Sequence, residues 1–181
     1  HLAAGANETI ALDIDPYLLV PAQRIVQGEQ LRLTEAALAV ADASDVSRAW
    51  TLEARQGPLT ANAFQCVFAD GLQPPFADQS FDTVLTPWFL DQVPRDLPAF
   101  LGQVARLLRP GGTWLNQGPL IYPEQTPFEL RYARQELFAL AEQAGVAAGA
   151  FTVTSQPYLV SPLTRRGKVE AVLSFIARRP P

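Results

Sequence analysis

Two carboxylates stand at the ends of short apolar runs. The run TIALD ends in Asp13, and the run FQCVFA ends directly before Asp70. Such runs are typical of buried strands, and a carboxylate at the end of a strand can accept two hydrogen bonds from a ribose diol. A second carboxylate, one strand later, can accept a hydrogen bond from the exocyclic amine of adenine. The pair therefore indicates a nucleoside-binding edge of an α/β sheet.

Both aspartates also have a purely structural interpretation. Asp13 can support the cap of the next helix, for which Asp15 is the expected N-cap and Pro16 the first residue. Asp70 is followed by Gly71, and Asp-Gly is a common turn sequence. For each aspartate the sequence leaves the ligand-binding and the structural interpretation open.

The amino-acid composition limits which catalytic and metal-binding groups the chain can use. The one histidine is His1 and the one cysteine is Cys66. Triads of Ser, His and Asp, Cys/His pairs and histidine metal sites are therefore excluded, and we expect no metal. A single cysteine is also typical of a reducing compartment, so we expect a cytoplasmic protein. Catalysis must then use carboxylates, hydroxyls, aromatic rings or an organic cofactor.

Charge and hydropathy exclude two classes of partner. The 14 basic and 18 acidic residues give a net charge of -4 and a pI near 5.0, which disfavours binding to nucleic acid or to an anionic membrane. The start, HLAAGANET, has neither the basic nor the apolar region of a signal peptide, and no run of about 18 apolar residues occurs, so we expect neither secretion nor membrane insertion. With 181 residues, of which 48% are hydrophobic, we expect a single domain over residues 1–181.

The elements that must position these residues alternate between strands and helices. Strands are predicted at 9–13, 64–69, 81–86, from 113, at 151–153 and at 169–176, and residues 41–63 are predicted to be a connection. Helices are predicted from Pro16 through Leu33, Ala37 and Val40, from Asp96 to Leu108, and over 129–143. Strands that alternate with helices favour a Rossmann-like, doubly wound and mostly parallel α/β sheet, whose ligands bind at the carboxyl ends of the strands.

Several short sequence motifs occur in a characteristic order along the chain. LDIDP is followed by D-x(4)-PF-x(4)-FD-x-V and by an amphipathic helix that ends in LLRPGG. This order resembles class I S-adenosylmethionine-dependent methyltransferases. A more specific resemblance, to the carnosine N-methyltransferase group, also called N2227-like proteins, rests on three segments: TPWFLDQV, GGTWLNQGPLIY and EAVLSFIARRP. The resemblance implies an antiparallel C-terminal strand and S-adenosylmethionine as the cofactor.

The resemblance also implies which residues bind the cofactor: Asp13, Ile14, Asp70, Gly71, Thr86 and Pro87. In it, Asp13 binds the ribose with Ile14 beside the adenine, and Asp70 with Gly71 lies at the adenine edge. The step from Thr86 to Pro87 lines the methyl-transfer site.

Four residues are implied at the catalytic centre: Trp88, Asp91, Asn116 and Tyr122. Asp91 would face the acceptor and could accept its proton, while Asn116 and Tyr122 would flank the same pocket. Aromatic rings suit this site because their faces attract a cationic sulfonium and exclude water. The structural alternative is that Asp91 is an exposed or capping carboxylate ahead of the helix, and that Phe89 is core packing.

The chain departs from the resemblance near the acceptor. Pro123 occupies the position of a histidine, and Gly167, Lys168 and Val169 replace tyrosines ahead of the last strand. The expected substrate is therefore an amine- or imidazole-containing acceptor, a small molecule or a peptide-like one, rather than carnosine in particular.

A further departure concerns the start of the chain. Class I methyltransferases have a strand and a G-x-G-x-G loop before the LDIDP segment, whereas this sequence begins at HLAAGAN. We expect an N-terminally truncated piece of a longer enzyme, with homodimerisation or strand exchange as one way to cover the resulting sheet edge. The alternative is a non-catalytic, Rossmann-like partner-binding module that has lost the cofactor. A third interpretation, a nicotinamide-dependent oxidoreductase, accounts for fewer of these sequence motifs.

Overall fold

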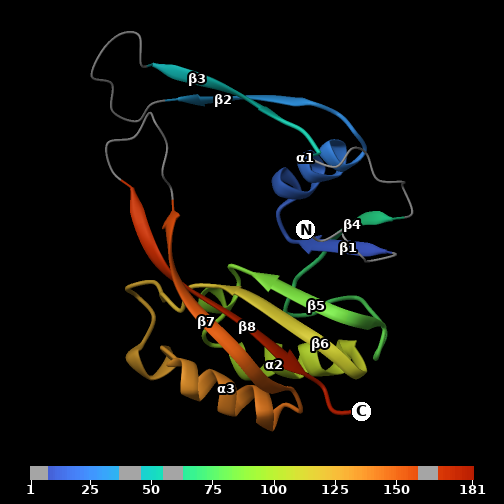
Figure 1. Cartoon of the computed structure of the whole chain (residues 1–181), viewed down its shortest axis with the longest axis vertical. Coiled ribbons are helices and arrows are strands. Elements are labelled where there is room, and N and C mark those ends of the chain that lie inside the picture. The colour runs from blue at the N-terminus through green and yellow to red at the C-terminus, as the bar shows by residue number, and fades with distance from the viewer. Residues whose placement is uncertain (1–7, 37–45, 55–62, 159–166) are drawn as a thin grey trace. The chain divides into compact units, whose positions relative to one another are not determined.

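The computed structural model describes residues 8–36, 46–54, 63–158 and 167–181 (Figure 1). These residues cluster into two compact units. The first unit holds the described residues up to Pro74 together with Gly167, and the second holds those of Pro75–Leu159 and Lys168–Pro181. Each unit is described by itself, and a single domain over 1–181 stays a prediction.

The elements of the first unit are β1 (Thr9–Asp13), α1 (Pro16–Val26), β2 (Leu31–Ala36), β3 (Ser47–Leu52) and β4 (Phe64–Phe68). Those of the second unit are β5 (Phe81–Pro87), the 3-10 turn η2 (Leu90–Gln92), α2 (Leu97–Leu107), β6 (Leu108–Gly118), the 3-10 turn η3 (Phe128–Leu130), α3 (Arg134–Gln143), β7 (Ala147–Tyr158) and β8 (Lys168–Arg178).

The first unit contains the predicted parallel strands that end near the aspartates. β1 and β4 pair in parallel, with Asp13 opposite Phe68. The N-terminus of α1 is also as predicted, because Oδ1 of Asp15 accepts a hydrogen bond from the backbone nitrogen of Tyr17 at 2.8 Å and Pro16 is the first helical residue. The carboxyl ends of both strands therefore lie at the same edge of this small sheet.

The prediction of a long helix beyond Val26 is wrong. Gly28 has a φ of 97°, in the left-handed region that favours glycine, and the helix ends before it. Residues Leu31–Ala36 then form β2, which pairs antiparallel with β3. β3 lies inside residues 41–63, which were predicted to be a connection. Strand pairing with a distant segment here overrides a weak helical spacing. Ala37 and Val40 lie outside the described residues.

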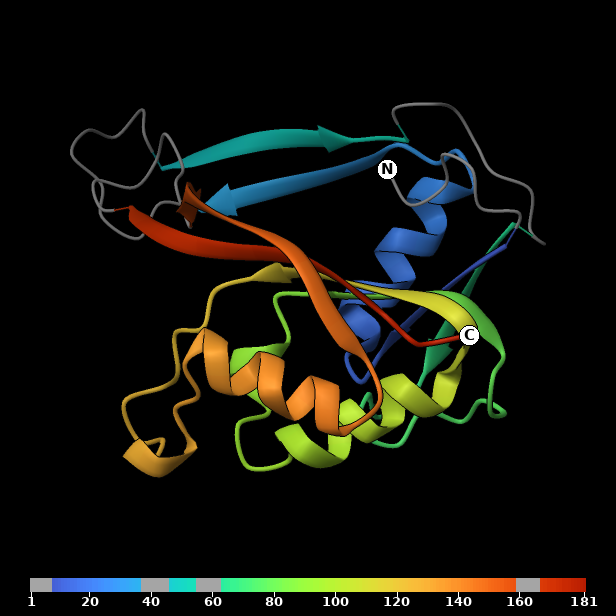
Figure 2. The ribbon, with the colours of Figure 1, turned by 60° about the horizontal axis from the view of Figure 1, so that its bottom comes forward.

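The second unit is a four-stranded sheet with two helices on one face (Figures 1 and 2). The strand order is β5-β6-β8-β7, in which β5 and β6 are parallel while β8 runs antiparallel to both of its neighbours. The antiparallel last strand is the one that the resemblance implies, and with β5 and β6 parallel the sheet of this unit is mixed. Among the described residues, no helix has the length and apolar character needed to cross a membrane.

The core of the second unit lies between the sheet and its helices. α2 buries the apolar stripe that its spacing predicts: Leu97, Phe100, Leu101, Val104 and Leu107. On the sheet, the fully buried ring of Trp114 packs edge-on against Phe175, with ring centroids 4.8 Å apart. Phe138 of α3 contacts Phe175 as well. One continuous apolar layer thus joins β6, β8 and α3.

Several predicted boundaries in the second unit differ from the structure. The strand predicted at 151–153 is the twelve-residue β7. The strand predicted from 113 begins at Leu108. The helix predicted from 129 begins at Arg134, because Oε2 of Glu136 accepts the backbone N–H of Ala133 at 2.7 Å and caps the helix there. Predicted boundaries shift where long-range pairing or a local cap decides them.

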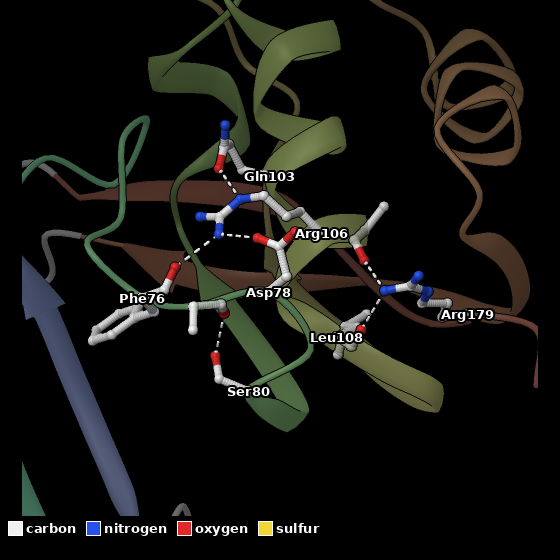
Figure 3. Close-up of polar contacts among 9 residues, drawn as sticks. Phe76, Asp78, Ser80, Gln103, Arg106, Leu108 and Arg179 are labelled. Carbon is white, nitrogen blue, oxygen red and sulfur yellow. Dashed lines mark hydrogen bonds and ion pairs between the residues drawn. The ribbon is translucent and has the colours of Figure 1, made fainter.

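Arg106, near the end of α2, fixes the turn that precedes β5 (Figure 3). Its Nη1 donates to the carbonyl oxygen of Phe76 at 2.7 Å and to Oδ1 of Asp78 at 2.8 Å, while its Nε donates to Gln103. The polar turn in PPFADQS is therefore tied to α2. This contact sets where β5 begins.

Arg179 closes the C-terminal end of α2 from the other side (Figure 3). Its Nη1 donates to the carbonyl oxygens of Ala105 at 2.8 Å and Leu108 at 2.5 Å, which have no partner within the helix. The backbone of Gly111 also donates to Arg179 and Pro180. The Pro110–Gly111 corner is thus held against the end of β8 as β6 begins.

We predict that Arg179→Ala lowers the free energy of unfolding by about 1–3 kcal/mol, because two helix-end carbonyls lose a charged donor. The matched control is Arg178→Ala. The Arg178 side chain is exposed and has no partner among the described residues, so this change should stay within about 0.5 kcal/mol. Urea unfolding of both variants measures the difference. Equal losses in the two variants would contradict a capping role for Arg179.

Candidate active site

Trp88 leaves β5 in an unusual backbone conformation. Its φ is 53°, and its N–H donates to the carbonyl oxygen of Gln117 on β6 at 2.8 Å. A Cβ at Gly118 would lie 3.0 Å from both the nitrogen and the Cα of Trp88. Only glycine therefore lets β6 approach this closely. A non-glycine residue held in the left-handed region is a form of strain that clusters at functional sites.

The ring of Trp88 stacks on Tyr158, which the sequence analysis did not identify. The ring centroids are 4.9 Å apart and the ring planes differ by 17°. Tyr158 ends β7 and pairs with Lys168 of β8, one of the positions at which this chain lacks the tyrosines of the resembled group. An aromatic residue is thus present at this level of the sheet on the neighbouring strand. Residues 153–158 (VTSQPY) show no alternation of apolar and polar side chains, so no local pattern predicts a strand that reaches Tyr158.

Thr86 and Asn116 are brought together between β5 and β6. They are register partners, with exposures of 7% and 4%, and Nε1 of the buried Trp114 donates to Oγ1 of Thr86 at 2.9 Å. With its amide nitrogen toward β5, Asn116 donates to the backbone oxygen of Thr86 at 2.7 Å and to Oγ1 at 2.9 Å; the reverse orientation would bring two oxygens to 2.7 Å. The network joins the two strand ends. Direct contact of either residue with a ligand stays a prediction.

Asp91 is a buried carboxylate without a cationic partner among the described residues. It lies in η2 with 5% of its surface exposed, and its one hydrogen bond from another side chain comes from Nε2 of Gln92 at 3.2 Å. Burial raises the pKa of this carboxyl, and the negative charge of Glu170 on β8 raises it further. Asp91 is therefore neither an exposed carboxylate nor a helix cap. The structure adds Glu170, which sequence reasoning missed, to its surroundings.

Tyr122 lies within reach of the charge of Asp91. Burial is the main cause that raises the pKa of its hydroxyl to about 12, and the charge of Asp91 adds to the shift. The hydroxyl donates to the carbonyl oxygen of Tyr132 at 3.2 Å. Tyr122 therefore stays protonated at neutral pH and can act as a hydrogen-bond donor but not as a base. The two residues thus interact electrostatically, and their grouping around one acceptor pocket stays a prediction.

The helix predicted from Asp96 begins there, but the Asp96 side chain, for which the sequence favours a capping role, does not cap it. Asp96 stands at the N-terminus of α2, but its side chain makes no capping hydrogen bond, and the first turn is closed by its backbone oxygen, which accepts from Phe100 at 2.8 Å. The helix begins there because Pro98 suits a first turn and the apolar stripe starts at Leu97.

The predicted cofactor aspartates belong to the first unit, where both make turns. Oδ1 of Asp13 accepts the N–H of Asp15 at 2.8 Å, and Oδ1 of Asp70 accepts the N–H of Leu72 at 2.8 Å. In each carboxylate the second oxygen has no bond among the described residues. The structural and the ligand-binding interpretations are therefore compatible.

The hydrogen-bond acceptors at this sheet edge suit an adenosine group. The two remaining carboxylate oxygens stand at the ends of adjacent parallel strands, as a ribose diol and an adenine amine require. Ile14 follows Asp13 and is 65% exposed, so an apolar side chain is available to cover a base. The roles of Gly71 and Pro87 stay predictions.

We predict that Gly118→Ala costs about 1–3 kcal/mol and separates Trp88 from Tyr158, because the new methyl group would overlap the Trp88 backbone. Gly102→Ala is the control: its Cβ meets nothing within 4 Å, and alanine in α2 should stabilise by up to about 1 kcal/mol. Chemical unfolding and tryptophan fluorescence report the two effects. If Gly118→Ala is as stable as Gly102→Ala, the close approach does not constrain this site.

Comparison with known proteins agrees with the sequence resemblance. A family model described as "Carnosine N-methyltransferase" matches residues 4–179. A carnosine N-methyltransferase from Dictyostelium discoideum is 42% identical over 45 residues, which are 25% of this chain and 10% of that protein. The aligned segment thus spans about a tenth of the curated relative.

Solved structures share the fold. A methyltransferase dependent on S-adenosylmethionine from Methanosarcina mazei matches with a TM-score of 0.63 at 15% identity, covering 99% of this chain and 85% of its own. A structure of the Haloferax volcanii Trm112 methyltransferase activator in complex with a methyltransferase matches with a TM-score of 0.61 at 14% identity, covering 97% of this chain and 72% of the other. The fold is the Rossmann-like α/β fold of class I methyltransferases, and S-adenosylmethionine is the cofactor that family and fold imply. Since the family model matches nearly the whole sequence, this chain belongs to the carnosine N-methyltransferase family.

Proposed function

We propose that the full-length protein transfers a methyl group from S-adenosylmethionine to a nitrogen of a small amine- or imidazole-containing, peptide-like acceptor. The observation that carries this proposal is Asp91, a carboxylate that is 5% exposed, has no cationic partner among the described residues and has a raised pKa. Such a group is costly to bury as an anion unless a ligand compensates it. A basic nitrogen is a ligand of that kind.

The cofactor supplies an electrophilic methyl group carried on a sulfonium sulfur. The residues that would hold it are Asp13 and Asp70, through the carboxylate oxygens that their turns leave free, together with the exposed side chain of Ile14. Asp13 suits the ribose hydroxyls, and Asp70 suits an adenine amine.

Asp91 is the proposed base. When the acceptor nitrogen gains a methyl group it must lose a proton, and a carboxylate whose pKa is shifted toward neutrality is better matched to accept that proton. The hydroxyl of Tyr122, protonated at neutral pH, can donate a hydrogen bond but cannot compete as a base. The acceptor nitrogen is thus proposed to bind at Asp91.

The stacked rings of Trp88 and Tyr158 are proposed to form an aromatic wall of the site. Aromatic faces exclude water and attract cations, both of which favour a reaction that starts from a sulfonium. The tight contact between Trp88 and Gly118 holds the wall in place before any ligand binds. Asn116 and Thr86 support it from the strands below.

The alternative of a non-catalytic partner-binding module is not favoured by the family and fold matches. No observation on the described residues favours an oxidoreductase. Cytoplasmic location and homodimerisation remain predictions from the sequence.

Replacing the proposed base tests the mechanism. We expect Asp91→Asn to keep the shape of the site and to lower kcat by about 100-fold or more, since general-base catalysis contributes at least that factor. Transfer of a tritiated methyl group to amine and imidazole acceptors by the full-length protein measures the effect. Glu142→Gln, which changes an exposed carboxylate on α3, should leave kcat unchanged. Full activity of Asp91→Asn would exclude Asp91 as the base.

The same substitution tests the electrostatics of Asp91 without catalysis. Because the folded state raises the pKa of Asp91 above its unfolded value of about 3.9, folding favours the protonated form. That stabilising contribution is complete below the unfolded pKa and is lost as the pH rises through the folded pKa. Asp91→Asn should therefore unfold at higher denaturant than the wild type at neutral pH, with a smaller difference near the unfolded pKa. If the stability of the wild type instead rises relative to that of Asp91→Asn as the pH increases, the folded protein stabilises Asp91 as an anion.

A further inference from the structure

A groove of about 250 Å³ opens in the second unit between two loops. Residues 92–96 line one side, and Pro123 with residues 125–127 lines the other. Ligand pockets usually have volumes of about 300–1,000 Å³, so this groove is large enough for one part of a small molecule. Its lining mixes prolines with polar side chains, which is typical of a site that fixes orientation.

The groove adjoins Asp91. Gln92 lines the groove, and its Nε2 donates to Oδ1 of Asp91 at 3.2 Å. The opposite side begins at Pro123, directly after Tyr122, whose pKa responds to the charge of Asp91. The groove therefore begins at the chain neighbours of Asp91 and Tyr122.

Arg95 is the cationic side chain that lines this groove. It is exposed and has no hydrogen bond or ion pair with any of the described residues; Asp96, beside it, forms no ion pair with it either. Other arginines of the second unit are engaged in structural contacts: Arg106, Arg109, Arg131 and Arg179. The guanidinium of Arg95 is thus free to bind an anion, for which its planar donors are well suited.

Both sides of the groove are fixed by hydrogen bonds. Nε of Arg131 donates to the carbonyl oxygen of Thr126 at 2.9 Å, and its Nη2 donates to that of Glu124 at 2.7 Å. The N–H of Thr126 donates to the carbonyl oxygen of Pro123 at 2.9 Å. On the other side, the N–H of Asp96 donates to Val93 at 3.2 Å. A groove that is held in shape before binding loses less entropy when a ligand enters it.

We propose that this groove binds the part of the acceptor that is remote from the methylated nitrogen, and that Arg95 selects acceptors bearing an anionic group there, a carboxylate or a phosphate. The proposal rests on the proposed function, because it assigns Asp91 to the basic nitrogen of the same molecule. Arg95 is then a specificity-determining residue that acts on binding of the acceptor and not on proton transfer.

Kinetics with paired acceptors test the role of Arg95. The acceptors are short imidazole-containing peptides with a free C-terminal carboxylate, the same peptides with a C-terminal amide, and an amine bearing a phosphate ester. Arg95→Gln should raise KM for the anionic acceptors by about tenfold or more, with kcat and the KM of the amides unchanged. Arg178→Gln removes another exposed, unpaired arginine that does not line the groove, and it should change neither. Equal effects of Arg95→Gln on carboxylate and amide acceptors would overturn the proposal.

A binding measurement separates the groove from the reaction. N-acetylglycine, its amide and inorganic phosphate are titrated into the isotopically labelled protein, and the backbone amide signals of residues 92, 93, 95, 96, 125 and 126 are followed by NMR. We expect chemical-shift changes with one or both anions but not with the amide. These changes should be lost in Arg95→Gln and kept in Arg178→Gln. The anion that binds more tightly shows whether the groove prefers a carboxylate or a phosphate. No shift with either anion would overturn the proposal even if methyl transfer is observed. Arg95-dependent shifts without methyl transfer to any acceptor would support the groove and contradict the proposed function.

Discussion

The parallel register of β5 and β6 is the constraint on which the candidate site depends. It sets Thr86 opposite Asn116 and brings Gly118 against the backbone of Trp88, where no larger residue fits. Because both strands end at the same edge of the sheet, the chain that follows β5 carries Asp91 and the chain that follows β6 carries Tyr122 into one neighbourhood. The corner after α2, held by Arg179, fixes where β6 begins and hence this register.

Burial gives the site its chemistry. Asp91 and Tyr122 both have raised pKa values, chiefly because they are withdrawn from water. One is a carboxylate whose affinity for a proton is increased, and the other is a hydroxyl that keeps its proton. Two titratable groups with separate roles, beside an aromatic pair, form a surrounding suited to deprotonating a nitrogen as it is alkylated. Arg95, which has no partner among the described residues, lines the adjoining groove and is proposed to select the acceptor.

Local signals predicted the parts of the fold that local interactions decide. The cap at Asp15, the strand that ends at Asp13 and the Pro110 corner follow from turn and helix chemistry within a few residues. The β2–β3 pair was missed because its strands are specified by each other and not by their own patterns. Tyr158 and Glu170 were missed for the same reason: they reach Trp88 and Asp91 only through the pairing of β7 and β8. The hydrogen bonding between Thr86 and Asn116 follows from the β5–β6 register, which no local pattern specifies, and their place at the methyl-transfer site stays a prediction.

The most direct test of the central claim, that the protein is an S-adenosylmethionine-dependent N-methyltransferase, is calorimetric titration of the full-length protein with S-adenosylhomocysteine, the product that the cofactor leaves. We predict saturable binding that weakens when Asp13 is replaced by alanine, since that carboxylate is assigned to the ribose. Absence of binding to the full-length protein would contradict the assignment of this sheet edge to the cofactor, and with it the proposed reaction.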